Sequence, residues 1–493
     1  MKLERVKTTW QNGKMKLKEY HFTIKPTIIF AAIYLIAMSA VLRANVYYHD
    51  DIQRACVGWP TWGFSRHISN FLSSFLHTGT YLADISPLPQ FLAVIIIALT
   101  SVLVVYLITG EKKFTVWHYI SAIPIALSPY FLECLSFKYD SPYMALSVFF
   151  SVLPLLFCNG NRIKYIFCTI LGVIGMCMSY QASAGIFPML VIVMGITRWI
   201  KGEKTGEVLR FYGISAVGYL LGLVVFRKLL MTELVAYAST TLAPVPELLS
   251  CAIYNYKRYI VHFLEGFKLE WIAVTFLICV CFLFTAVMCS KQNKIVTFFV
   301  VGAAMIIMFA LAFGVYPFLT DPIFYPRAMY GIGCFIAFQG IFASTMVSKG
   351  YLAKFGCLVL TWYFFVFSFA YGNALNVQVT YTDFRITEAI DDLLECEAVG
   401  SEEPVTLQIT GSIGYAPGVK NMLSDFPMLK KLIYPMFQGD GWWGEFGIRN
   451  YYALPEFQFA ESYDPPEEEL PVIADNYYHT ICADEDYIWI DLH

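Results

Sequence analysis

The sequence predicts a polytopic α-helical membrane protein. Of its 493 residues, 58% are hydrophobic and only 14% are charged, whereas soluble domains carry about 25% charged residues. The hydrophobic residues form long runs, whereas an outer-membrane β-barrel would show alternating segments of about ten residues. This composition and the net charge of −3 exclude a soluble enzyme, a disordered chain and a nucleic-acid-binding protein.

Eleven runs are predicted to cross the membrane as helices, each of which needs about 20 mostly apolar residues. They lie at 24–43, 91–109, 116–136, 142–158, 164–180, 183–199, 211–230, 270–289, 295–314, 328–347 and 355–372. Two of them, 142–158 and 164–180, are short. We therefore expect about 11 transmembrane helices.

Lysine and arginine predict the orientation of these helices. With the N-terminus inside, the short inside segments hold 19 Lys and Arg, and the longer outside loops hold ten. The segment from Gly372 to the end holds 22 of the 37 acidic residues. The positive-inside rule therefore predicts an inside N-terminus, and an odd number of spans places the C-terminus outside.

The predicted domains follow from these spans. Residues 1–372 form a transmembrane domain with a large first external loop at 45–90. Residues 373–493 form an external soluble α/β domain, with a helix at 384–398 and strands at 405–410 and 487–492. Cys396 and Cys482 are the two cysteines of this domain, and they are a candidate disulfide because an external compartment can be oxidising.

Two other outside segments have distinct features. In the first loop, Ile68, Phe71, Leu72, Phe75 and Leu76 follow helical spacing and alternate with polar residues. This pattern predicts a helix that lies in the membrane interface. The segment 231–270 is rich in tyrosine and is expected to lie outside, where it is too long to be a mere connection between spans.

The residues that could perform chemistry gather at the outer ends of the spans. Asp50 and Asp51 follow the first span, and one of two adjacent carboxylates in a partly desolvated cleft can act as a general base. Further polar residues stand at neighbouring outer ends: Asp84, Gln90, Lys138, Tyr139, Asp140, Tyr180, Gln181 and Arg327. Ionisable groups near a membrane are costly and usually functional. A transporter would instead place them near the midplane.

The ordered motifs of these outer ends resemble a known family. They read YYHDDIQRA, GFSRHISNFL, DISPLPQ, FKYDSPYMAL and SYQAS. Together with the many spans, they resemble the serotype-converting O-antigen glucosyltransferases (Gtr), which belong to the GT-C group of polyprenyl-phosphate-sugar glycosyltransferases. The resemblance covers residues 30–350, and the tail is similar only in being external.

The resemblance implies a membrane enzyme of the bacterial cytoplasmic (inner) membrane whose active site faces the periplasm. The donor would be undecaprenyl-phosphate glucose, made by a partner synthase and delivered by a partner flippase. The acceptor would be a hydroxyl of a lipid-linked or surface polysaccharide, and the transfer would invert the anomeric centre. Membrane lipid is the other expected partner, and neither a cofactor nor a divalent metal is expected.

The resemblance and the chemistry of the side chains together assign roles. The catalytic candidates are Asp50 or Asp51 as the base, with a preference for Asp50, and Asp140 as a second acidic position. The donor-phosphate candidates are Arg327 first, followed by Arg54, Arg66, Lys138 and Arg258, because arginine binds phosphate through paired donors. The substrate-binding candidates are Tyr139, Tyr180, Gln181, Asp84 and Gln90.

Two alternatives to the glycosyltransferase stay open. One is a transporter or flippase of lipid-linked sugars, which the absence of midplane charges and repeats disfavours. The other is a polymerase or ligase of surface glycans, which the acidic pair in the first outer loop disfavours. The identities of the donor sugar and of the acceptor are not readable from the sequence.

Overall fold

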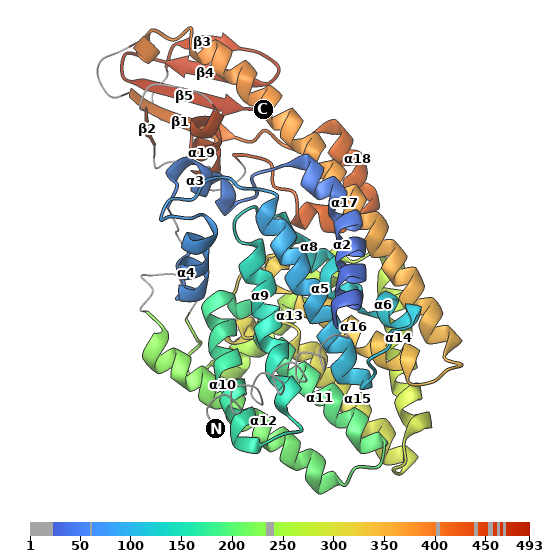
Figure 1. Cartoon of the computed structure of the whole chain (residues 1–493). Coiled ribbons are helices and arrows are strands. Elements are labelled where there is room, and N and C mark those ends of the chain that lie inside the picture. Colours follow the sequence, from blue (N-terminus) through green and yellow to red (C-terminus); the bar gives the residue numbers. More distant parts are fainter. Residues whose placement is uncertain are drawn as a thin grey trace, which may run out of the picture.

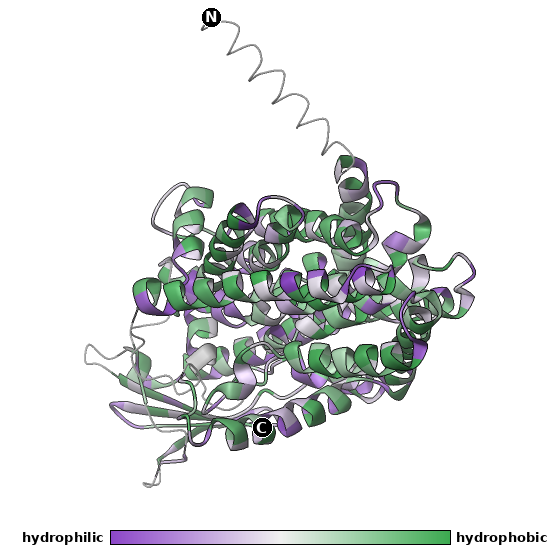
Figure 2. Ribbon diagram, turned by 90° about the horizontal axis from the view of Figure 1, so that it is seen from below, coloured by the Kyte–Doolittle hydropathy of each residue, from purple (hydrophilic) through white to green (hydrophobic). Residues whose placement is uncertain are grey.

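The computed structural model describes residues 23–59, 62–232, 241–400, 405–437, 442–451, 457–460, 464–466 and 470–493. Figure 1 shows a large helical part and, at its upper end, a small C-terminal sheet. The helices of the large part are coloured mainly as hydrophobic in Figure 2. This is the architecture of a multi-pass membrane protein, as the sequence predicts.

Eight helices of the described chain are long and apolar enough to cross a membrane. They are α2 (Ile24–Ala44), α5 (Leu88–Thr109), α10 (Arg162–Ser179), α11 (Ile186–Ile200, preceded by η3, Gln181–Gly185), α12 (Thr205–Val225, continued by η4, Phe226–Leu230), α14 (Leu269–Cys289), α15 (Lys294–Leu311) and α17 (Tyr351–Leu393). Each of them overlaps one of the predicted spans over most of its length.

The other three predicted spans are helical but irregular. The first consists of α6 (Val116–Ala122), α7 (Pro124–Leu127) and α8 (Pro129–Ser136), with a bend of 60° that would make it a ninth span if the helices count as one. The bend lies at Ser128, which is extended because Pro129 follows it. The other two are shorter helices, α9 (Ser141–Val152, continued by η2, Leu153–Phe157) and α16 (Gly331–Thr345). The number of eleven membrane crossings therefore stays a prediction.

Helix α17 is longer than the predicted span. It has 43 residues and includes most of the tail helix predicted at 384–398. No proline interrupts it, and its buried positions keep helical spacing up to Leu393. The predicted domain boundary at Gly372 therefore lies inside one continuous helix, which connects the membrane part to the C-terminal sheet.

Gly372 is the point where α17 packs most closely on α2. A Cβ atom at this position would lie 2.4 Å from the carbonyl carbon of Ala40, so the close approach of the two helices requires glycine. One turn earlier, the hydroxyl of Ser368 donates to the carbonyl oxygen of Ala37 at 2.9 Å. These contacts hold the outer end of α2, and hence the start of the first external loop, against α17.

The predicted outside segment 231–270 is more than a connecting loop. It contains α13 (Leu248–Gly266), a 19-residue helix that buries Ala252, Asn255, Tyr259, Phe263 and Gly266. The spacing of these residues is helical, but two charged residues and several tyrosines interrupt the apolar run. The described structure places α13 against η6 (Tyr316–Phe318) and η9 (Pro427–Lys431).

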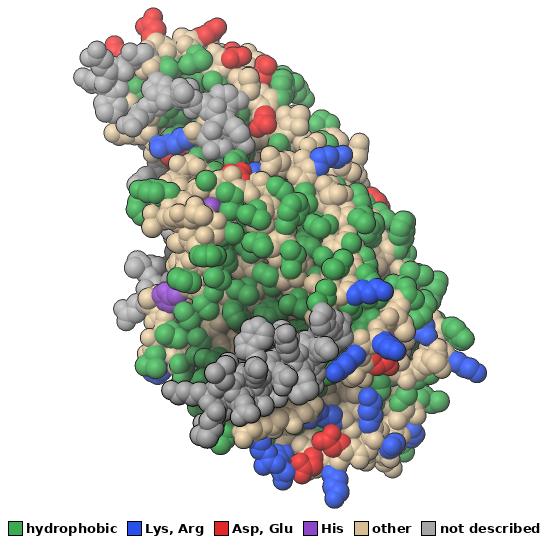
Figure 3. All heavy atoms as spheres, in the orientation of Figure 1, with side chains coloured by type: hydrophobic (Ala, Val, Ile, Leu, Met, Phe, Trp, Pro, Cys, Tyr) green, Lys and Arg blue, Asp and Glu red, His purple; other side chains and the backbone are tan. Residues whose placement is uncertain are grey.

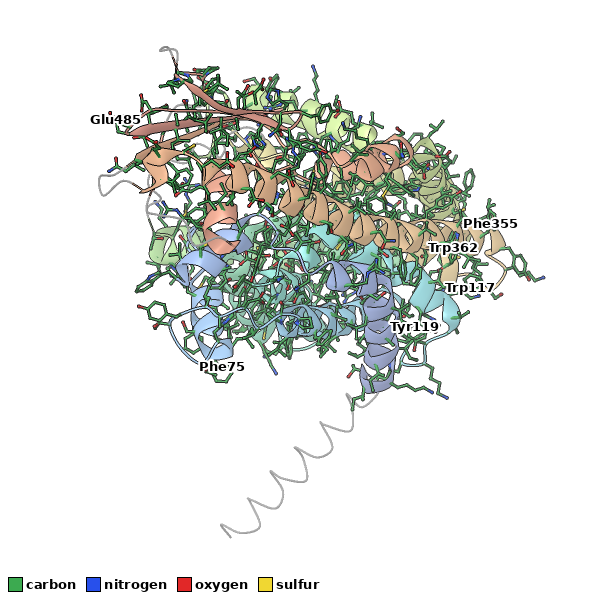
Figure 4. All side chains as sticks on the ribbon, turned by 90° about the horizontal axis from the view of Figure 1, so that it is seen from above. Phe75, Trp117, Tyr119, Phe355, Trp362 and Glu485 are labelled. Atoms are coloured by element: carbon green, nitrogen blue, oxygen red, sulfur yellow. The ribbon has the colours of Figure 1, made fainter. Side chains whose placement is uncertain are left out.

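The helix predicted within the first external loop is present as α4 (His67–Leu76). Its serines Ser69 and Ser73 are buried against the protein, whereas Phe71 is 73% and Phe75 is 79% exposed. Figure 4 shows the Phe75 side chain projecting from the edge of the molecule. A helix that turns its aromatic face outward suits contact with lipid, so the interface position stays the interpretation of this element.

The C-terminal sheet has five strands in the order β2-β1-β5-β4-β3. They are β1 (Val405–Gly411), β2 (Phe457–Phe459), β3 (Val472–Asp475), β4 (His479–Ala483) and β5 (Tyr487–Leu492). β1 pairs in parallel with β2 and β5, and β4 pairs antiparallel with β3 and β5. The strands predicted at 405–410 and 487–492 are thus confirmed as β1 and β5. One face of the sheet packs on the end of α17 through Ile386, Ile390 and Leu393.

The disulfide expected between Cys396 and Cys482 is wrong. Both thiols are free and buried. Cys396 belongs to the core beneath the sheet, together with Ile481 and Ala483 of β4. Side chains alternate between the two faces of a strand, so Cys482 points to the opposite face.

Charge is distributed unevenly over the molecule. On the face shown in Figure 3, Lys and Arg gather at the lower end of the helical part, and Asp and Glu predominate around the sheet at the upper end. Two predicted inside loops meet each other, since the backbone N–H of Lys291 donates to the carbonyl oxygen of Ile200 at 2.8 Å. The predicted inside and outside segments therefore lie at different ends of the protein.

Candidate active site

Asp51 is a structural anchor in the first external loop. Its side chain is completely buried and accepts hydrogen bonds from the backbone N–H groups of Lys138 at 2.7 Å, Tyr48 at 3.2 Å and Tyr139 at 3.3 Å. Burial raises the pKa of Asp51 to about 8, with a further rise from Asp140 and an opposing effect of the backbone N–H of Lys138. These bonds fasten the loop to the turn between α8 and α9, and they leave Asp51 poorly placed to receive a proton from a substrate.

Asp50 is the exposed member of the acidic pair. It begins α3 (Asp50–Val57), and its side chain is 39% exposed. The buried guanidinium of Arg54 lies 3.7 Å from Asp50 and 3.1 Å from Asp140, and Asp140 also accepts a hydrogen bond from the indole N–H of Trp62. Of the three predicted catalytic carboxylates, Asp50 is the one that a substrate can reach.

His49, directly before Asp50, has an unusual backbone conformation. His49 has φ 48° and ψ −116°, an uncommon conformation for a residue other than glycine. Its ring packs 4.2 Å from that of Tyr434 and 5.9 Å from that of Tyr325, measured between centroids. Burial lowers the pKa of His49 well below its ordinary value, and Arg327 lowers it further, so the ring is neutral at pH 7.

Arg327 is paired with a carboxylate that the sequence analysis missed. Glu133 of α8 is fully buried and accepts from the Arg327 guanidinium at 2.7 Å and from the Arg327 backbone N–H. The hydroxyl of Tyr48 donates to the same carboxylate at 3.4 Å. Glu133 is the one acidic residue in the predicted span 116–136, and a carboxylate inside an apolar run is the signal that could have identified it.

Asp50 contributes to the electrostatic environment of Arg327. Although burial lowers the pKa of Arg327, Glu133 raises it well above its ordinary value, and Tyr180, Asp50 and Tyr434 add to the rise. Asp50 therefore lies within electrostatic range of this guanidinium. The positive charge of Arg327, however, is largely balanced by Glu133.

Arg66 is a predicted cation whose charge no carboxylate of the described residues balances. In the described part of the chain, no carboxylate pairs with it, and its buried Nε has no hydrogen-bond partner. Its guanidinium lies over the ring of Tyr180 at 4.6 Å. Burial raises the pKa of Tyr316, and Arg66 and Arg327 both oppose that rise, so both guanidinium groups act electrostatically on the same residue.

Gln181 and Arg258 have supporting positions around this site. The amide of Gln181 donates to the carbonyl oxygen of Phe64 at 2.7 Å, which holds the turn that precedes Arg66. Arg258 of α13 lies over the ring of Phe324 at 4.1 Å, next in the chain to Tyr325. Gln181 thus holds the loop that precedes Arg66, and Arg258 lies close to the residue that precedes Tyr325.

Two of the remaining predicted residues border a separate cavity of about 270 Å³. Gln90 and Lys138 line it, and Lys138 pairs with Asp84 at 2.9 Å. Tyr139 stacks on the ring of His77 instead, at 5.8 Å. The structure therefore divides the predicted site residues between the surroundings of Asp50 and this cavity, and Tyr48 forms part of the wall between them.

The C-terminal part covers the Asp50 region. The hydroxyl of Tyr48 donates to the carbonyl oxygen of Leu432 at 2.8 Å, and Tyr434 reaches the ring of His49. Figure 1 shows α19 (Trp442–Tyr451) directly above α3, and the thiol of Cys56 donates to the carbonyl oxygen of Phe446 at 3.2 Å.

Comparison with known proteins identifies the family. Residues 39–338 match the family described as "Glucosyl transferase GtrII", which is well over half of the chain. The chain belongs to the GtrII glucosyltransferase family. It is also 23% identical over 450 residues to an "uncharacterized 55.3 kDa protein in gtrB 5'region" of Salmonella phage P22, covering 85% of this chain and 88% of the relative. No solved structure matches.

Membership of the GtrII family makes the protein a glycosyltransferase and confirms the resemblance seen in the sequence. The matched range contains Asp50, Arg66, Glu133 and Arg327. Tyr434 lies outside it, so the cover over the Asp50 region comes from a part of the chain beyond the family match. The roles of the individual residues, and the absence of a metal or cofactor, stay predictions.

Proposed function

We propose that this GtrII-family protein transfers glucose from a polyprenyl-phosphate donor, such as undecaprenyl-phosphate glucose, to a hydroxyl of a surface polysaccharide such as O-antigen. The reaction takes place at the periplasmic face of the bacterial cytoplasmic membrane. The observation that carries the proposal is an exposed carboxylate, Asp50, which lies 3.7 Å from the guanidinium of Arg54 and acts electrostatically on Arg327, in a protein of a glucosyltransferase family.

Asp50 acts as the general base in this proposal. Its carboxylate accepts the proton of the acceptor hydroxyl while the hydroxyl oxygen attacks the anomeric carbon of the donor. The bond between that carbon and the phosphate oxygen breaks, and the bonding electrons leave with the polyprenyl phosphate. One displacement inverts the anomeric centre, and the proton resides on Asp50 until solvent removes it.

Arg66 stabilises the leaving group. The donor phosphate carries one negative charge as a diester and gains a second as the glycosidic bond breaks. A cation placed where charge develops lowers the barrier, and arginine suits phosphate because it stays charged and offers paired donors. Arg66 has no carboxylate partner in the described chain, which makes it the first choice, and Arg327, held by Glu133, is the second.

The donor requires two further activities in the same cell. A synthase must attach the sugar to the polyprenyl phosphate, and a flippase must move the product to the outer leaflet. Neither activity belongs to this chain in our proposal. Membership of a glucosyltransferase family argues against the transporter alternative.

Reconstitution of the full chain in lipid nanodiscs tests the proposal. The protein is incubated with a surface polysaccharide and with undecaprenyl-phosphate glucose, galactose or N-acetylglucosamine, and the products are analysed by mass spectrometry and by NMR of the new anomeric centre. We expect a gain of one hexose from the glucose donor, with inversion and without added metal. Transfer from a sugar nucleotide instead, or retention of configuration, would overturn the proposal.

The side of the membrane needs its own measurement. Alkaline phosphatase fused after His493 should be active in cells, because that enzyme matures outside the cytoplasm, and a fusion within the loop 198–210 should be inactive. The reverse pattern would place the Asp50 region inside.

A further inference from the structure

The cavity at the outer ends of α2 and α5 is lined by apolar residues on one side and polar residues on the other. Its apolar wall comes from Val41, Leu42 and Leu375, and its polar wall includes Gln90 and Lys138. Its volume is about 270 Å³, close to the lower end of ligand pockets, which begin at about 300 Å³. A single ring fits such a space better than an oligosaccharide does.

Gln90 indicates that the cavity receives a polar ligand. The residue is only 6% exposed and lines the cavity, and its amide oxygen has no hydrogen-bond partner. A buried acceptor without a donor is unfavourable. A ligand hydroxyl would satisfy this oxygen.

The charge of the cavity excludes an anion as the preferred ligand. Its ammonium group, that of Lys138, is already paired with Asp84 at 2.9 Å and lies 3.9 Å from the ring centre of Tyr47. A phosphate would have to compete with Asp84 for this cation. Hydroxyl groups for Gln90 and a hydrocarbon face for Leu42 and Leu375 together describe a neutral sugar ring.

The cavity is separate from the Asp50 region. Neither Asp50 nor Arg327 lines it, and Tyr48 stands between the two sites with its hydroxyl bonded to Leu432 and Glu133. A hydroxyl that reacts must come within hydrogen-bond reach of its base. A ring bound in the cavity is therefore not the ring that receives the glucose.

We propose that this cavity binds a second, non-reacting sugar ring of the acceptor polysaccharide and thereby contributes to acceptor choice. The inference rests on the proposed function for the identity of the acceptor, but the binding of a neutral sugar ring does not depend on the donor. Gln90 is the specificity-determining residue of this site, and Lys138, fixed by Asp84, is its neighbour.

A binding experiment without donor tests the site directly. The full-length protein in nanodiscs is titrated with methyl glucoside, galactoside, mannoside and rhamnoside, followed by saturation-transfer NMR. We expect saturable binding of at least one of these sugars, weakened about 3- to 10-fold by Gln90→Leu, which is the effect of one hydrogen bond. Gln339→Leu is the matched control, since Gln339 of α16 is also a buried glutamine with an unpartnered amide oxygen but does not line the cavity.

Competition distinguishes other occupants of the cavity. Glycerol phosphate and inorganic phosphate should not displace the bound sugar. Displacement by either would indicate a lipid headgroup or anion site and would overturn the proposal. Equal sugar binding by Gln90→Leu and the unchanged protein would overturn it as well.

Kinetics then place the sugar on the acceptor. In Gln90→Leu, the KM for the acceptor should rise about 3- to 10-fold, whereas the KM for the donor and the kcat at saturating acceptor should change less than about twofold. A rise in the donor KM alone would assign the cavity to the donor and refute the inference. If no polyprenyl-phosphate sugar is used at all, the proposed function fails, while the binding experiment still decides whether the cavity takes a sugar.

Discussion

At the scale of single residues, the adjacent carboxylates Asp50 and Asp51 have different environments. Asp51 is buried beneath three backbone N–H donors, and Asp50 is exposed beside Arg54. Asp50→Asn should reduce turnover by about 10²–10⁴-fold, the usual contribution of a general base, without a change in thermal stability. Transfer rates and melting curves of the purified variant measure both. Near-normal turnover in Asp50→Asn would remove this residue from the mechanism.

Asp51 should instead affect the pH dependence of stability. Burial raises its pKa to about 8 in the folded protein, compared with about 3.9 for an unfolded chain. The folded state therefore retains a proton that the unfolded state releases, so this residue's contribution to stability decreases as the pH rises from about 4 to about 8. The Tm of Asp51→Asn, which cannot ionise, should vary less over this range than that of Asp50→Asn. Parallel Tm profiles for the two variants would contradict the assignment.

Substitutions of Arg66 and Arg258 should differ in their effects on the use of the donor. Arg66→Ala should reduce kcat/KM for the donor by about 10- to 150-fold, because hydrogen bonds to charged groups contribute about 1.5–3 kcal/mol. Arg66→Lys should retain part of the activity. Arg258→Ala, at the rim, is the matched control and should have a smaller effect in the same assay. Equal losses for both alanine variants would show that Arg66 has no special role.

Arg327 should contribute to folding as well as to activity. Removing one partner of a buried ion pair leaves an uncompensated charge and typically costs about 3–5 kcal/mol. Arg327→Met and Glu133→Gln should each lower the Tm clearly, and the double variant should be more stable than the sum of the two effects predicts. Additive losses in this double-mutant cycle would mean that the pair observed at 2.7 Å contributes little.

At the scale of helices, α4 has its polar face buried and its aromatic face exposed, the reverse of a surface helix in a soluble protein. In a soluble protein the apolar face of a surface helix is buried, but here Ser69 and Ser73 are buried and Phe71 and Phe75 are exposed. A photo-crosslinking phenylalanine at position 75 should form adducts with lipid in nanodiscs. The same amino acid at Phe384, an exposed position near the C-terminal end of α17, should not. Mass spectrometry of the crosslinked peptides decides between these outcomes.

Hydropathy alone does not predict α13, and it predicts only the membrane part of α17. In α13 the buried residues follow a regular spacing, but Lys257 and Arg258 lower the average hydropathy of the segment. In α17 the polar residues after Gly372 mark the end of the apolar run, although nothing there stops the helix. Hydropathy indicates where a chain leaves the bilayer, and helix ends depend on caps and breakers instead.

At the scale of the whole molecule, the C-terminal part is attached to the membrane part at several points. Ion pairs join Lys268 to Asp425 at 2.6 Å and Lys431 to Glu265 at 3.0 Å, and α18 (Pro417–Asp425) packs on α17. The segment that follows brings Tyr434 to His49. Exposed ion pairs contribute little by themselves, so the ring contact is the more informative one to remove.

Tyr434→Ala should therefore lower the rate of transfer by about tenfold, on the order of the 1.4 kcal/mol that corresponds to one decade. The fold should be retained, because the residue is 38% exposed. Tyr477→Ala, at an exposed position on the sheet, is the control. Unchanged transfer in Tyr434→Ala would show that the C-terminal part does not contribute to the reaction.

The class of protein, and the end of the molecule at which its polar residues gather, can be predicted from the sequence. Long apolar runs, basic loops and ordered motifs suffice for this prediction. Burying polar groups in a bilayer is costly, so membrane-spanning segments are strongly apolar. The sequence also led to the correct family, through motifs at the outer ends of the helices. These signals are local in the chain, so they can be read without a structure.

Which of these residues contact one another follows from the three-dimensional fold and could not be predicted from the sequence. The pairing of Arg327 with Glu133, of Lys138 with Asp84 and of Arg54 with Asp140 joins distant segments, and in each pair a carboxylate balances the charge of a candidate phosphate-binding cation. The prediction of a disulfide between Cys396 and Cys482 was wrong for the same reason, since Cys482 points to the face of the sheet opposite to the core that contains Cys396. Burial and ion pairing depend on contacts between residues far apart in the chain, and no local pattern records them.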